Sequence, residues 1–540
     1  MLLLENTFAN SAFMANESYQ APFRFLILGL GETGVAMAKW CLRNGAKVRF
    51  ADTRDQSSFS ARQHAWLQEL QIAGLKDICF GPVGDELLKD IDVIGIGPGL
   101  SPLQEPIQSL LARAEAAEID VWSEIEFFAR ALSAISRMAL AQETSYASAV
   151  LAITGTNGKT TTTALTGQLC ERAGKKVAVA GNISPAALEK LMSCLDGADQ
   201  IVDMPEVWVI ELSSFQLVYT HTFNATAATV LNITQDHLDW HGDMQAYTTA
   251  KSKIFGDDTV CVLNRDDPLA MGLLSEKQTT EKSIVTFGSN RPDEQDAFGI
   301  EHDLRAGGID WLVWAEVDEE VEPQPKRRRK SAALQEDESL RLKRLIPADA
   351  LRIRGRHNAL NALAALALAR AAKLPLNVLL HGLRDYHGEP HRVQSIAIVR
   401  DVEYVDDSKG TNVGATVAAL NGLGSNEAGK RIWLIVGGDG KGQDFSPLRE
   451  PALRFVKGAF LIGKDGAAIG EALGTGIPIT NCIDLRSAVK AAAGQAVSGD
   501  IVLLSPACAS FDQFRDYLER AQVFASEVEE LGMQFEGVQA

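Results

Sequence analysis

Residues 151–163 read LAITGTNGKTTTT, an apolar run that enters a glycine-rich turn and leaves through a lysine and four threonines. This pattern predicts a strand, a phosphate-binding loop and a helix start, because backbone amides there point toward an anion. Lys159 would add positive charge, and the Thr160 hydroxyl would ligate Mg²⁺. Ile153 stands where the common loop has its first glycine, which favours a shorter GTNGKT variant over signalling NTPases. An ordinary turn before a helix is the alternative; we predict that the chain binds ATP.

The composition is that of a soluble α/β protein with more than one core. The chain has 540 residues, of which 46% are hydrophobic and 23% charged, and its net charge is −18. This length predicts about three domains. No apolar run approaches the roughly 20 residues that span a membrane, and the opening twenty residues lack the pattern of a secretory signal. The negative charge disfavours a nucleic-acid groove. We therefore expect a cytoplasmic monomer that binds neither nucleic acid nor a membrane.

Seven cysteines are scattered along the chain without CxxC spacing: Cys41, Cys79, Cys170, Cys194, Cys261, Cys482 and Cys508. This spacing argues against a disulfide framework and against a structural zinc site. We expect buried, reduced thiols.

The chain reads as successive α/β units. Residues 23–52 predict strand, glycine turn, helix and strand, with Gly29, Gly31 and Gly34 in a GxGxxG pattern. Asp52 ends the second strand where a ribose-binding acid would lie, so NAD is one possible ligand. We predict a Rossmann-like N-terminal domain, a central ATPase-type α/β domain and a Rossmann-like C-terminal domain, at residues 1–123, 124–388 and 389–540.

Later segments repeat this alternation of strands and helices. Further strands are predicted at 93–96, 207–212, 228–234, 431–438 and 500–506, and a helix at 358–372. Residues 289–345 differ in composition, with acidic runs beside KRRRK at 326–330. We interpret this segment as a solvated insertion that is partly ordered around IDWLVWAEV. The basic run as a nucleic-acid patch is the alternative, which its acidic flanks disfavour.

Polar side chains follow two predicted central strands. Glu211 ends the first, where its carboxylate could hold Mg²⁺ opposite Thr160. The motif NITQDHLDWHG then gathers polar side chains at the end of the next strand, the usual ligand side of an α/β sheet: Asn232, Thr234, Asp236, His237 and Asp239. Thr234 or Asp236 could instead cap a helix. For His237, flanked by acids, a site role is favoured over core packing.

Eight motifs in order make the chain resemble the Mur ligases: TGTNGKTT, ELSSFQL, NITQDHLDWHG with AKSKIF, GRHNALNALAA, GEPHR, DDSKGTNVGAT, GGDGKGQDFSPL and SPACASFDQF. The closest resemblance within that family is to members that add D-glutamate to UDP-N-acetylmuramoyl-L-alanine. The match leaves out mainly the first twenty residues and 289–345. It implies a three-domain ligase of peptidoglycan precursor synthesis that uses ATP and two Mg²⁺ ions. The γ-phosphoryl group would convert a carboxylate to an acyl phosphate, which the amine of D-glutamate attacks.

The resemblance assigns residues to ATP: Gly155, Thr156, Asn157, Gly158, Lys159, Thr160, Thr161, Asn358, Asn361, Arg392 and Asp407. Among these, the two asparagines would lie near adenine, although they could instead be helix caps. Arg392 would reach the phosphates, and Asp407 would bind the ribose. The implied metal ligands are Thr160 and Glu211 for one ion, and His237 with a carbamoylated Lys251 for the other. An ordinary surface lysine is the alternative for Lys251, since Lys253 lies two residues away. The implied catalytic set is Lys159, His237, Lys251, Arg392 and Lys441.

The resemblance also assigns the other two substrates. Residues at and near the glycine turn would bind the diphosphate and uridine of the UDP-sugar in place of NAD: Glu32, Thr33, Asp52, Thr53, Arg54 and Gly99. Asn182 and Gln216 would meet the muramoyl-alanine part of the same substrate. Residues of the last domain would bind D-glutamate: Lys409, Thr411, Lys441, Ser510, Phe511 and Tyr517. Two rival hypotheses remain. One is another amide ligase, such as a neighbouring Mur ligase or a folylpolyglutamate synthase, and the other is a nucleotide-gated binding module without catalysis.

Overall fold

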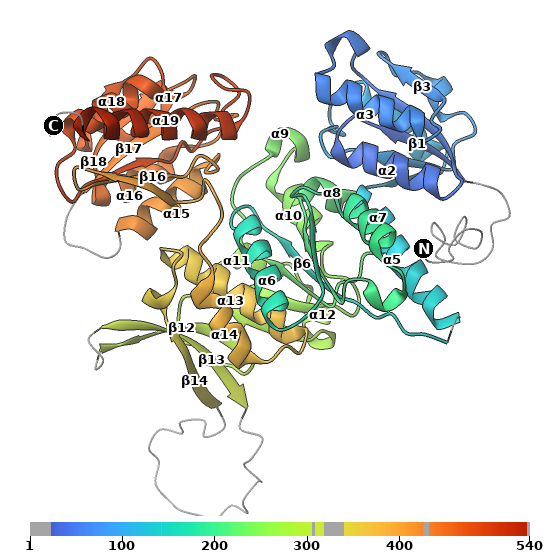
Figure 1. Ribbon diagram of the computed structural model, residues 1–540, viewed down its shortest axis with the longest axis horizontal. Helices are drawn as coiled ribbons and strands as arrows, with labels where there is room; N and C mark the ends of the chain where they lie inside the picture. The colour runs from blue at the N-terminus through green and yellow to red at the C-terminus, as the bar shows by residue number, and fades with distance from the viewer. Residues whose placement is uncertain (1–22, 142, 305–307, 318–339, 425–430, 537–540) are drawn as a thin grey trace, which may run out of the picture.

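The computed structural model describes residues 23–141, 143–304, 308–317, 340–424 and 431–536. Over these residues the chain forms N-terminal, central and C-terminal units, each built on its own sheet with helices packed against it (Figure 1). The central unit lies between the other two (Figure 1). The predicted α/β class is therefore confirmed.

The N-terminal unit has a parallel sheet, which over the described residues contains five strands in the order β3-β2-β1-β4-β5. Its strands are β1 (Arg24–Leu28), β2 (Lys47–Asp52), β3 (Asp77–Phe80), β4 (Val93–Ile96) and β5 (Asp120–Trp122). Its helices are α2 (Glu32–Arg43), α3 (Ala61–Ile72) and α4 (Ile107–Ala116). The strand, turn, helix and strand predicted at 23–52 are all present. A Cβ atom at Gly34 would lie 1.9 Å from the Gly29 carbonyl oxygen, so glycine lets α2 approach β1.

The central unit contains a mixed sheet of nine strands within the described ranges, in the order β14-β13-β12-β11-β10-β9-β6-β8-β7. Its strands are β6 (Ala149–Thr154), β7 (Val177–Gly181), β8 (Val207–Glu211), β9 (Ala227–Val230), β10 (Val260–Asn264), β11 (Ile284–Phe287), β12 (Ala297–Asp303), β13 (Ile309–Val317) and β14 (Leu340–Pro347). Its helices are α5 (Glu124–Ala141), α6 (Lys159–Arg172), α7 (Ala187–Gly197), α8 (Ser214–Val218), α9 (Leu238–His241), α10 (Met244–Ser252), α11 (Pro268–Met271), α12 (Glu276–Glu281), α13 (Arg356–Ala371) and α14 (Leu376–Asp385).

One central strand is shorter than predicted. The strand expected at 228–234 ends at Val230, because Asn232 leaves the sheet to bond the phosphate loop. Its side-chain oxygen accepts from the Asn157 amide at 2.8 Å, and its carbonyl oxygen accepts from the Thr156 amide at 2.9 Å.

The segment 289–345 is more ordered than predicted. The expected strand IDWLVWAEV is present as β13, but β12 and β14 flank it antiparallel and extend the central sheet. Phe298 and Trp314 are buried there with stacked rings 5.8 Å apart. The interpretation as a solvated insertion was therefore wrong for these strands, whose apolar side chains cover the sheet's core. The KRRRK run at 326–330 lies outside the described residues.

The C-terminal unit has a sheet that, over the described residues, contains six strands in the order β15-β16-β20-β17-β18-β19. Its strands are β15 (Gln394–Val399), β16 (Val402–Asp406), β17 (Ile432–Gly437), β18 (Val456–Ile462), β19 (Ile479–Asn481) and β20 (Ile501–Leu504). Its helices are α15 (Val413–Gly424), α16 (Arg449–Phe455), α17 (Gly466–Leu473), α18 (Leu485–Gln495) and α19 (Tyr517–Glu536). Strands β16, β20 and β17 are parallel neighbours, so the loops after them share one edge of the sheet.

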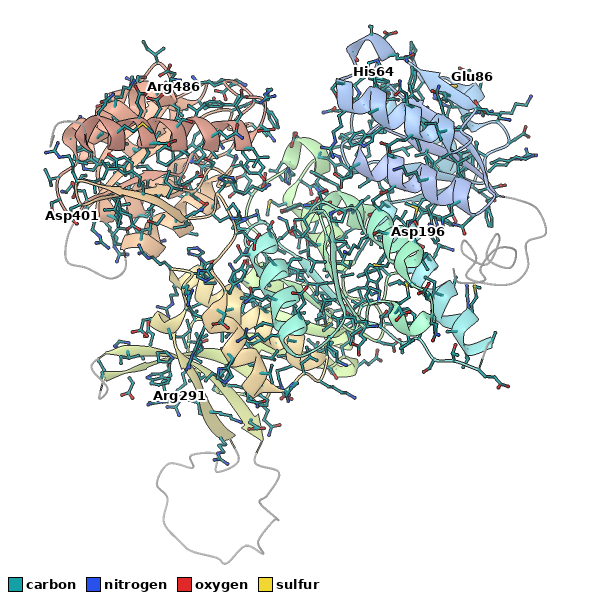
Figure 2. The ribbon with its side chains drawn as sticks, viewed as in Figure 1. His64, Glu86, Asp196, Arg291, Asp401 and Arg486 are labelled. Carbon is teal, nitrogen blue, oxygen red and sulfur yellow. The ribbon has the colours of Figure 1, made fainter. Side chains whose placement is uncertain are left out.

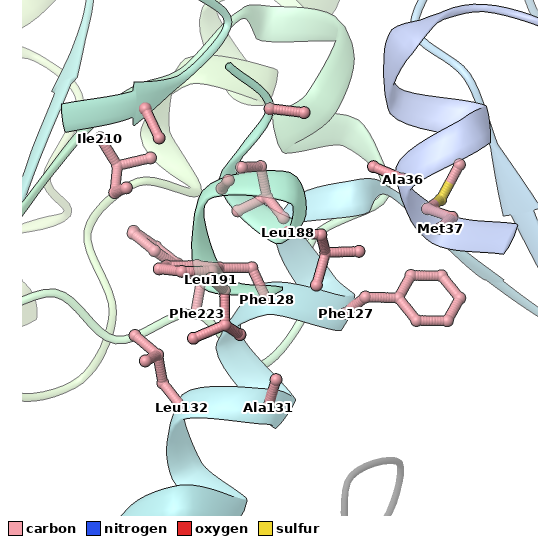
Figure 3. Packing of buried hydrophobic residues seen from close by; sticks show 14 of the residues in the cluster. Ala36, Met37, Phe127, Phe128, Ala131, Leu132, Leu188, Leu191, Ile210 and Phe223 are labelled. Carbon is pink, nitrogen blue, oxygen red and sulfur yellow. The ribbon is translucent and has the colours of Figure 1, made fainter. Parts of the chain in front are cut away.

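One hydrophobic core joins the N-terminal and central units. Helices α2, α5 and α7 pack together there, and Figure 3 shows Met37, Phe128 and Leu191 from these three helices. The Phe128 ring meets the buried Trp208 ring edge-on at 5.2 Å. An ion pair of 2.8 Å between Arg43 and Asp196, the latter labelled in Figure 2, also links α2 to α7.

The cysteines are all free, and Cys41, Cys170, Cys261 and Cys508 are buried. Cys79, Cys194 and Cys482 are partly exposed, so the expectation of buried thiols holds for four positions. Among the described helices, none combines the length and the apolar character needed to cross a membrane.

We expect Phe128→Ala to destabilise the paired N-terminal and central units, because it removes a buried ring from their shared core. The expected loss is about 3–5 kcal/mol of unfolding free energy, measured by urea denaturation. Ile72→Ala is the control, since this side chain is 88% exposed. Equal stability of the two variants would contradict a shared core.

Candidate active site

The phosphate loop predicted from the sequence joins β6 to α6. Gly155 and Gly158 have φ angles of +149° and +83°, which a residue with a Cβ rarely adopts. The loop is held from one side by Asn232, whose side chain bonds both the amide and the carbonyl of Asn157. The Lys159 ammonium donates to the carbonyls of Gly155 and Thr156, each at 2.9 Å. Its charge is therefore fixed at the loop, where burial lowers its pKa although Glu211 opposes this shift.

Glu211 lies directly beside this loop. It ends β8, and it pairs with Ile153 of the neighbouring β6. The carboxylate is buried: Oε1 accepts from the Asn182 amide at 2.9 Å, whereas Oε2 has no hydrogen-bond partner. A buried carboxylate oxygen without a partner is rare and costly, and it suits a cation ligand.

Thr160 and Glu211, the ligands predicted for one Mg²⁺ ion, are both oxygen donors. The described residues contain no group of three or more His, Cys, Asp or Glu side chains arranged to hold an ion. Mg²⁺ commonly takes only one or two protein oxygens, with phosphates and water completing its shell. The Thr160 hydroxyl accepts a hydrogen bond from the Arg392 guanidinium at 2.7 Å.

Lys251 is not a surface lysine. It lies on α10, is 1% exposed, and has its Nζ 3.5 Å from the Thr154 hydroxyl. The same Nζ lies 4.5 Å from the centre of the Tyr247 ring. Burial, followed by the charge of Lys159, lowers the pKa of Lys251 well below its ordinary value. Lys253, by contrast, is exposed, so the structure distinguishes the two lysines.

His237 lies at the rim of the site and not in the core. It has a φ of +55°, its side chain is 36% exposed, and its ring meets Phe215 edge-on at 4.7 Å. Burial lowers its pKa, against the opposing charge of Asp236. Helix α9 has His237 itself as its N-cap, without a side-chain hydrogen bond, so capping of α9 by Thr234 or Asp236 is wrong.

A cleft of about 860 Å³ opens between the N-terminal and central units. All eight residues predicted to bind the UDP-sugar line it: Glu32, Thr33, Asp52, Thr53, Arg54, Gly99, Asn182 and Gln216. The last two come from the central unit. Asn182 also bonds Glu211, so one residue of the cleft wall contacts the strand end beside the phosphate loop.

Asp52 is already engaged inside this cleft. Its Oδ2 accepts from the Leu30 amide at 2.6 Å and from the Arg54 guanidinium at 2.7 Å. Burial alone would raise the pKa of Asp52, but the hydrogen bonds from Arg54 and the Leu30 amide lower it. Asp52 therefore fixes the backbone of Leu30 and the side chain of Arg54 in the cleft wall.

A second, smaller pocket lies between the central and C-terminal units. Predicted ATP residues line it: Asn157, Gly158, Thr161, Asn358, Asn361, Arg392 and Asp407. The two helix asparagines are buried, and the N-cap of α13 is Gly355, so they are not its caps. Burial raises the pKa of Asp407 to about 7, although the Ser505 hydroxyl opposes this by donating to its carboxylate at 2.6 Å. The structure places Gly155, Thr156 and Thr160 on the adjoining loop.

The predicted D-glutamate residues lie on loops of the C-terminal unit, apart from Tyr517, which begins helix α19. Lys409 has its Nζ 3.9 Å from the centre of the Tyr517 ring, and burial followed by the charge of Arg392 lowers its pKa to about 8. Ser510 is buried, whereas Thr411 is partly exposed. Lys441 is exposed and Phe511 is 68% exposed, so the structure does not enclose these two with the others.

Asn412 is a residue of this site that sequence reasoning missed. It is buried, and its Nδ2 donates to Asn157 at 3.0 Å and to Asp236 at 3.3 Å. It thus ties the C-terminal unit to the phosphate loop. Its place inside DDSKGTNVGAT was the available signal, but its orientation toward another domain was not readable there.

Comparison with known proteins identifies the family. Three family models match the chain: the Mur ligase MurD-like N-terminal domain at residues 23–122, the Mur ligase middle domain at 153–369, and the Mur ligase glutamate ligase domain at 391–508. The chain belongs to the Mur ligase family, which confirms the resemblance of its motifs.

Named relatives and solved structures agree with this family. The UDP-N-acetylmuramoylalanine–D-glutamate ligase of Cupriavidus pinatubonensis is 54% identical over 514 residues, covering 94% of this chain and 97% of the relative. The ligase of the same name from Ralstonia nicotianae is 54% identical and covers 93% and 96%.

Two Thermotoga maritima structures share the fold at low identity. The MurF ligase in complex with ADP has a TM-score of 0.54 at 16% identity, covering 94% of this chain and 98% of that one. The UDP-N-acetylmuramate-alanine ligase has a TM-score of 0.51 at 19% identity, covering 94% and 100%.

Proposed function

We propose that this chain is an ATP-dependent ligase that joins D-glutamate to UDP-N-acetylmuramoyl-L-alanine in peptidoglycan precursor synthesis. The observation that carries the proposal is the 54% identity, over 94% of the chain, to a relative named for this reaction. We also propose that it acts in the cytoplasm as a monomer without nucleic acid, and that its domains span residues 1–123, 124–388 and 389–540.

The reaction needs activation because a free carboxylate does not acylate an amine at neutral pH. A carboxylate oxygen of the sugar peptide attacks the γ-phosphorus of ATP, and the bond to ADP breaks. The amine of D-glutamate then attacks the acyl phosphate carbonyl and loses a proton, and the bond to phosphate breaks. The protein's contribution is positioning and charge neutralisation around these atoms.

The phosphate loop would hold the triphosphate through the amides of 155–161. Lys159 would contact the β- and γ-phosphates. Arg392, which bonds Thr160, would add a second positive charge from the linker to the C-terminal unit. The pocket lined by Asn358, Asn361 and Asp407 would take adenosine. Catalytic roles are thus proposed for Lys159 and Arg392, together with His237, Lys251 and Lys441.

Two Mg²⁺ positions are proposed beside the loop. Thr160 and the unpartnered oxygen of Glu211 fit the first, and His237 with Lys251 fits the second. When bound, these ions would neutralise phosphate charge and polarise the phosphoryl group. Carbamoylation of Lys251 is supported by its burial, because a neutral amine can react with CO₂ to give a carboxylate.

The UDP-sugar assignment rests on the shape of the large cleft. Its wall begins at the glycine turn near Asp52 and Arg54 and continues through Asn182 and Gln216 of the central unit. A ligand that extends from one unit to the other can bring its carboxylate to the phosphate loop, which a dinucleotide on the first unit alone would not require.

D-glutamate would bind at the loops of the C-terminal unit. Its two carboxylates call for cations and hydroxyl donors. The loops offer such groups at Lys409, Thr411, Lys441 and Ser510, with Phe511 and Tyr517 covering the aliphatic part.

The proposal is tested by incubating the chain with ATP, Mg²⁺, UDP-N-acetylmuramoyl-L-alanine and either glutamate enantiomer, followed by mass analysis. We expect the amide product with D-glutamate and one ADP per product. Ligation of a different amino acid would favour the rival amide ligases. Nucleotide binding without any product would favour the non-catalytic module.

We expect Lys159→Ala to reduce turnover at least about 100-fold, because it removes charge at the transferring phosphoryl group. UDP-sugar affinity, measured by calorimetry, should stay within about twofold, since that cleft does not include Lys159. Lys175→Ala is the matched control, because this lysine follows α6 and pairs with Glu206 at the surface. Unchanged phosphate release in Lys159→Ala would overturn its assigned role.

We expect Lys251→Ala to lose activity and to regain part of it with acetate or formate, which would replace the proposed carbamate oxygens. The readout is phosphate release across a carboxylate titration. Lys253→Ala, an exposed neighbour, should keep wild-type activity and show no response. If no short carboxylate restores any activity to Lys251→Ala, the carbamate is not supported.

A further inference from the structure

Arg520 is a buried cation on α19 that none of the assigned roles uses. It is 1% exposed, and its two terminal nitrogens donate to backbone carbonyls: Nη1 to Cys508 at 3.2 Å and Nη2 to Ser408 at 2.8 Å. Its Nε has no hydrogen-bond partner, and among the described residues no acid forms an ion pair with it, although the charges of Asp512, Asp406 and Asp407 act on it from farther away. Burial lowers its pKa to about 10. Burying a guanidinium without a paired acid is costly, and such costs concentrate at functional sites.

The two carbonyls belong to different loops at the same sheet edge. Ser408 follows β16 and Cys508 follows β20, and these strands are parallel neighbours. Directly beyond the two carbonyls, the first loop carries Lys409 and the second carries Ser510. Arg520 therefore spans two loops that each bear a proposed D-glutamate residue.

The same helix makes a third contact to these loops. Tyr517 lies one turn before Arg520 on α19, and its ring centre is 3.9 Å from the Lys409 ammonium. Two successive residues of the first loop, Ser408 and Lys409, therefore contact α19.

The loop that carries Lys441 joins this assembly through its backbone. Asp439 and Ala509 exchange two hydrogen bonds, of 3.0 and 2.9 Å. The loops after β17, β20 and β16 are therefore linked in series, and the Arg520 side chain joins the last two together with the 2.6 Å hydrogen bond from Ser505 to Asp407.

We propose that Arg520 is a positioning residue for the amino-acid pocket: its fork sets the spacing between residues 407–411 and 507–511, and its charge favours a dicarboxylate above them. This inference rests on the proposed function. A lysine keeps the charge but cannot make two divergent bonds from a planar group. The two contributions can therefore be separated by substitution.

The test measures steady-state kinetics of Arg520→Lys and Arg520→Gln in the full chain, with each substrate varied in turn. In Arg520→Lys we expect the KM for D-glutamate to rise about tenfold, as misplaced binding groups do, with kcat within about threefold. The glutamine variant, which also loses the charge, should show the larger rise. The KM values for ATP and the UDP-sugar should stay within about twofold in both variants.

Glu527→Gln is the matched control on the same helix. This buried acid pairs with Arg486, which is labelled on the C-terminal unit in Figure 2, and with Lys490 at 3.3 Å. The control should lower the melting temperature without changing the KM for D-glutamate. The proposal is overturned if both Arg520 variants keep the wild-type KM, if all three KM values rise together, or if the control reproduces the effect.

Amide hydrogen exchange gives a second measurement that needs no turnover. Residues 407–411 and 507–511 should exchange faster in Arg520→Lys than in the wild-type chain, while β18 stays unchanged. If Arg520→Lys does not fold, the exchange rates of the two segments in the wild-type chain provide the test. Equal and slow amide exchange in both segments would support their linkage by Arg520, and clearly different rates would overturn it. If the wild-type chain makes no D-glutamate product, the proposed function is refuted. The role of Arg520 in linking the loops is still tested, because amide exchange is measured without turnover.

Discussion

The register between β6 and β8 is the constraint on which the rest of the site depends. Because Ile153 pairs with Glu211, one strand delivers the phosphate loop and the next delivers a buried carboxylate at the same sheet edge. Asn182, at the end of β7, then bonds that carboxylate and also lines the large cleft. Three neighbouring strand ends thus bring together the loop, a buried carboxylate and the wall of the large cleft.

Several cationic side chains of this acidic protein lie near the site with little access to water. The net charge is −18, yet Lys251 and Arg520 are buried near the site, and Lys159 and Lys409 are half-buried there. Burial lowers the pKa of each, because a charged group loses hydration there. The substrates proposed here carry phosphates and carboxylates, so positive charge held away from water acts on them with little screening.

Features that depend on local backbone geometry could be predicted from the sequence. Features that depend on contacts between distant residues needed the family resemblance or were missed. The phosphate loop and its flanking strand and helix were readable, because glycine, lysine and threonine act there through local backbone geometry. The large cleft was also predictable, but only through family resemblance, since Asn182 and Gln216 come from another unit. Choosing Lys251 over Lys253 likewise needed the motif. The packing of β12 and β14 was missed, because charged residues flank both strands and Arg341, Lys343 and Arg344 lie among the apolar residues of β14. Arg520 carries no local signal at all.

The distribution of cores has a consequence for movement. The N-terminal and central units share one continuous core through α2, α5 and α7, whereas the clusters of the C-terminal unit contain only its own residues. Rotating the C-terminal unit therefore breaks polar contacts such as those of Asn412 and Arg392 but exposes little apolar surface. Opening for substrate entry would therefore cost the least free energy at the junction between the central and C-terminal units, because the core shared by the other two units would stay intact.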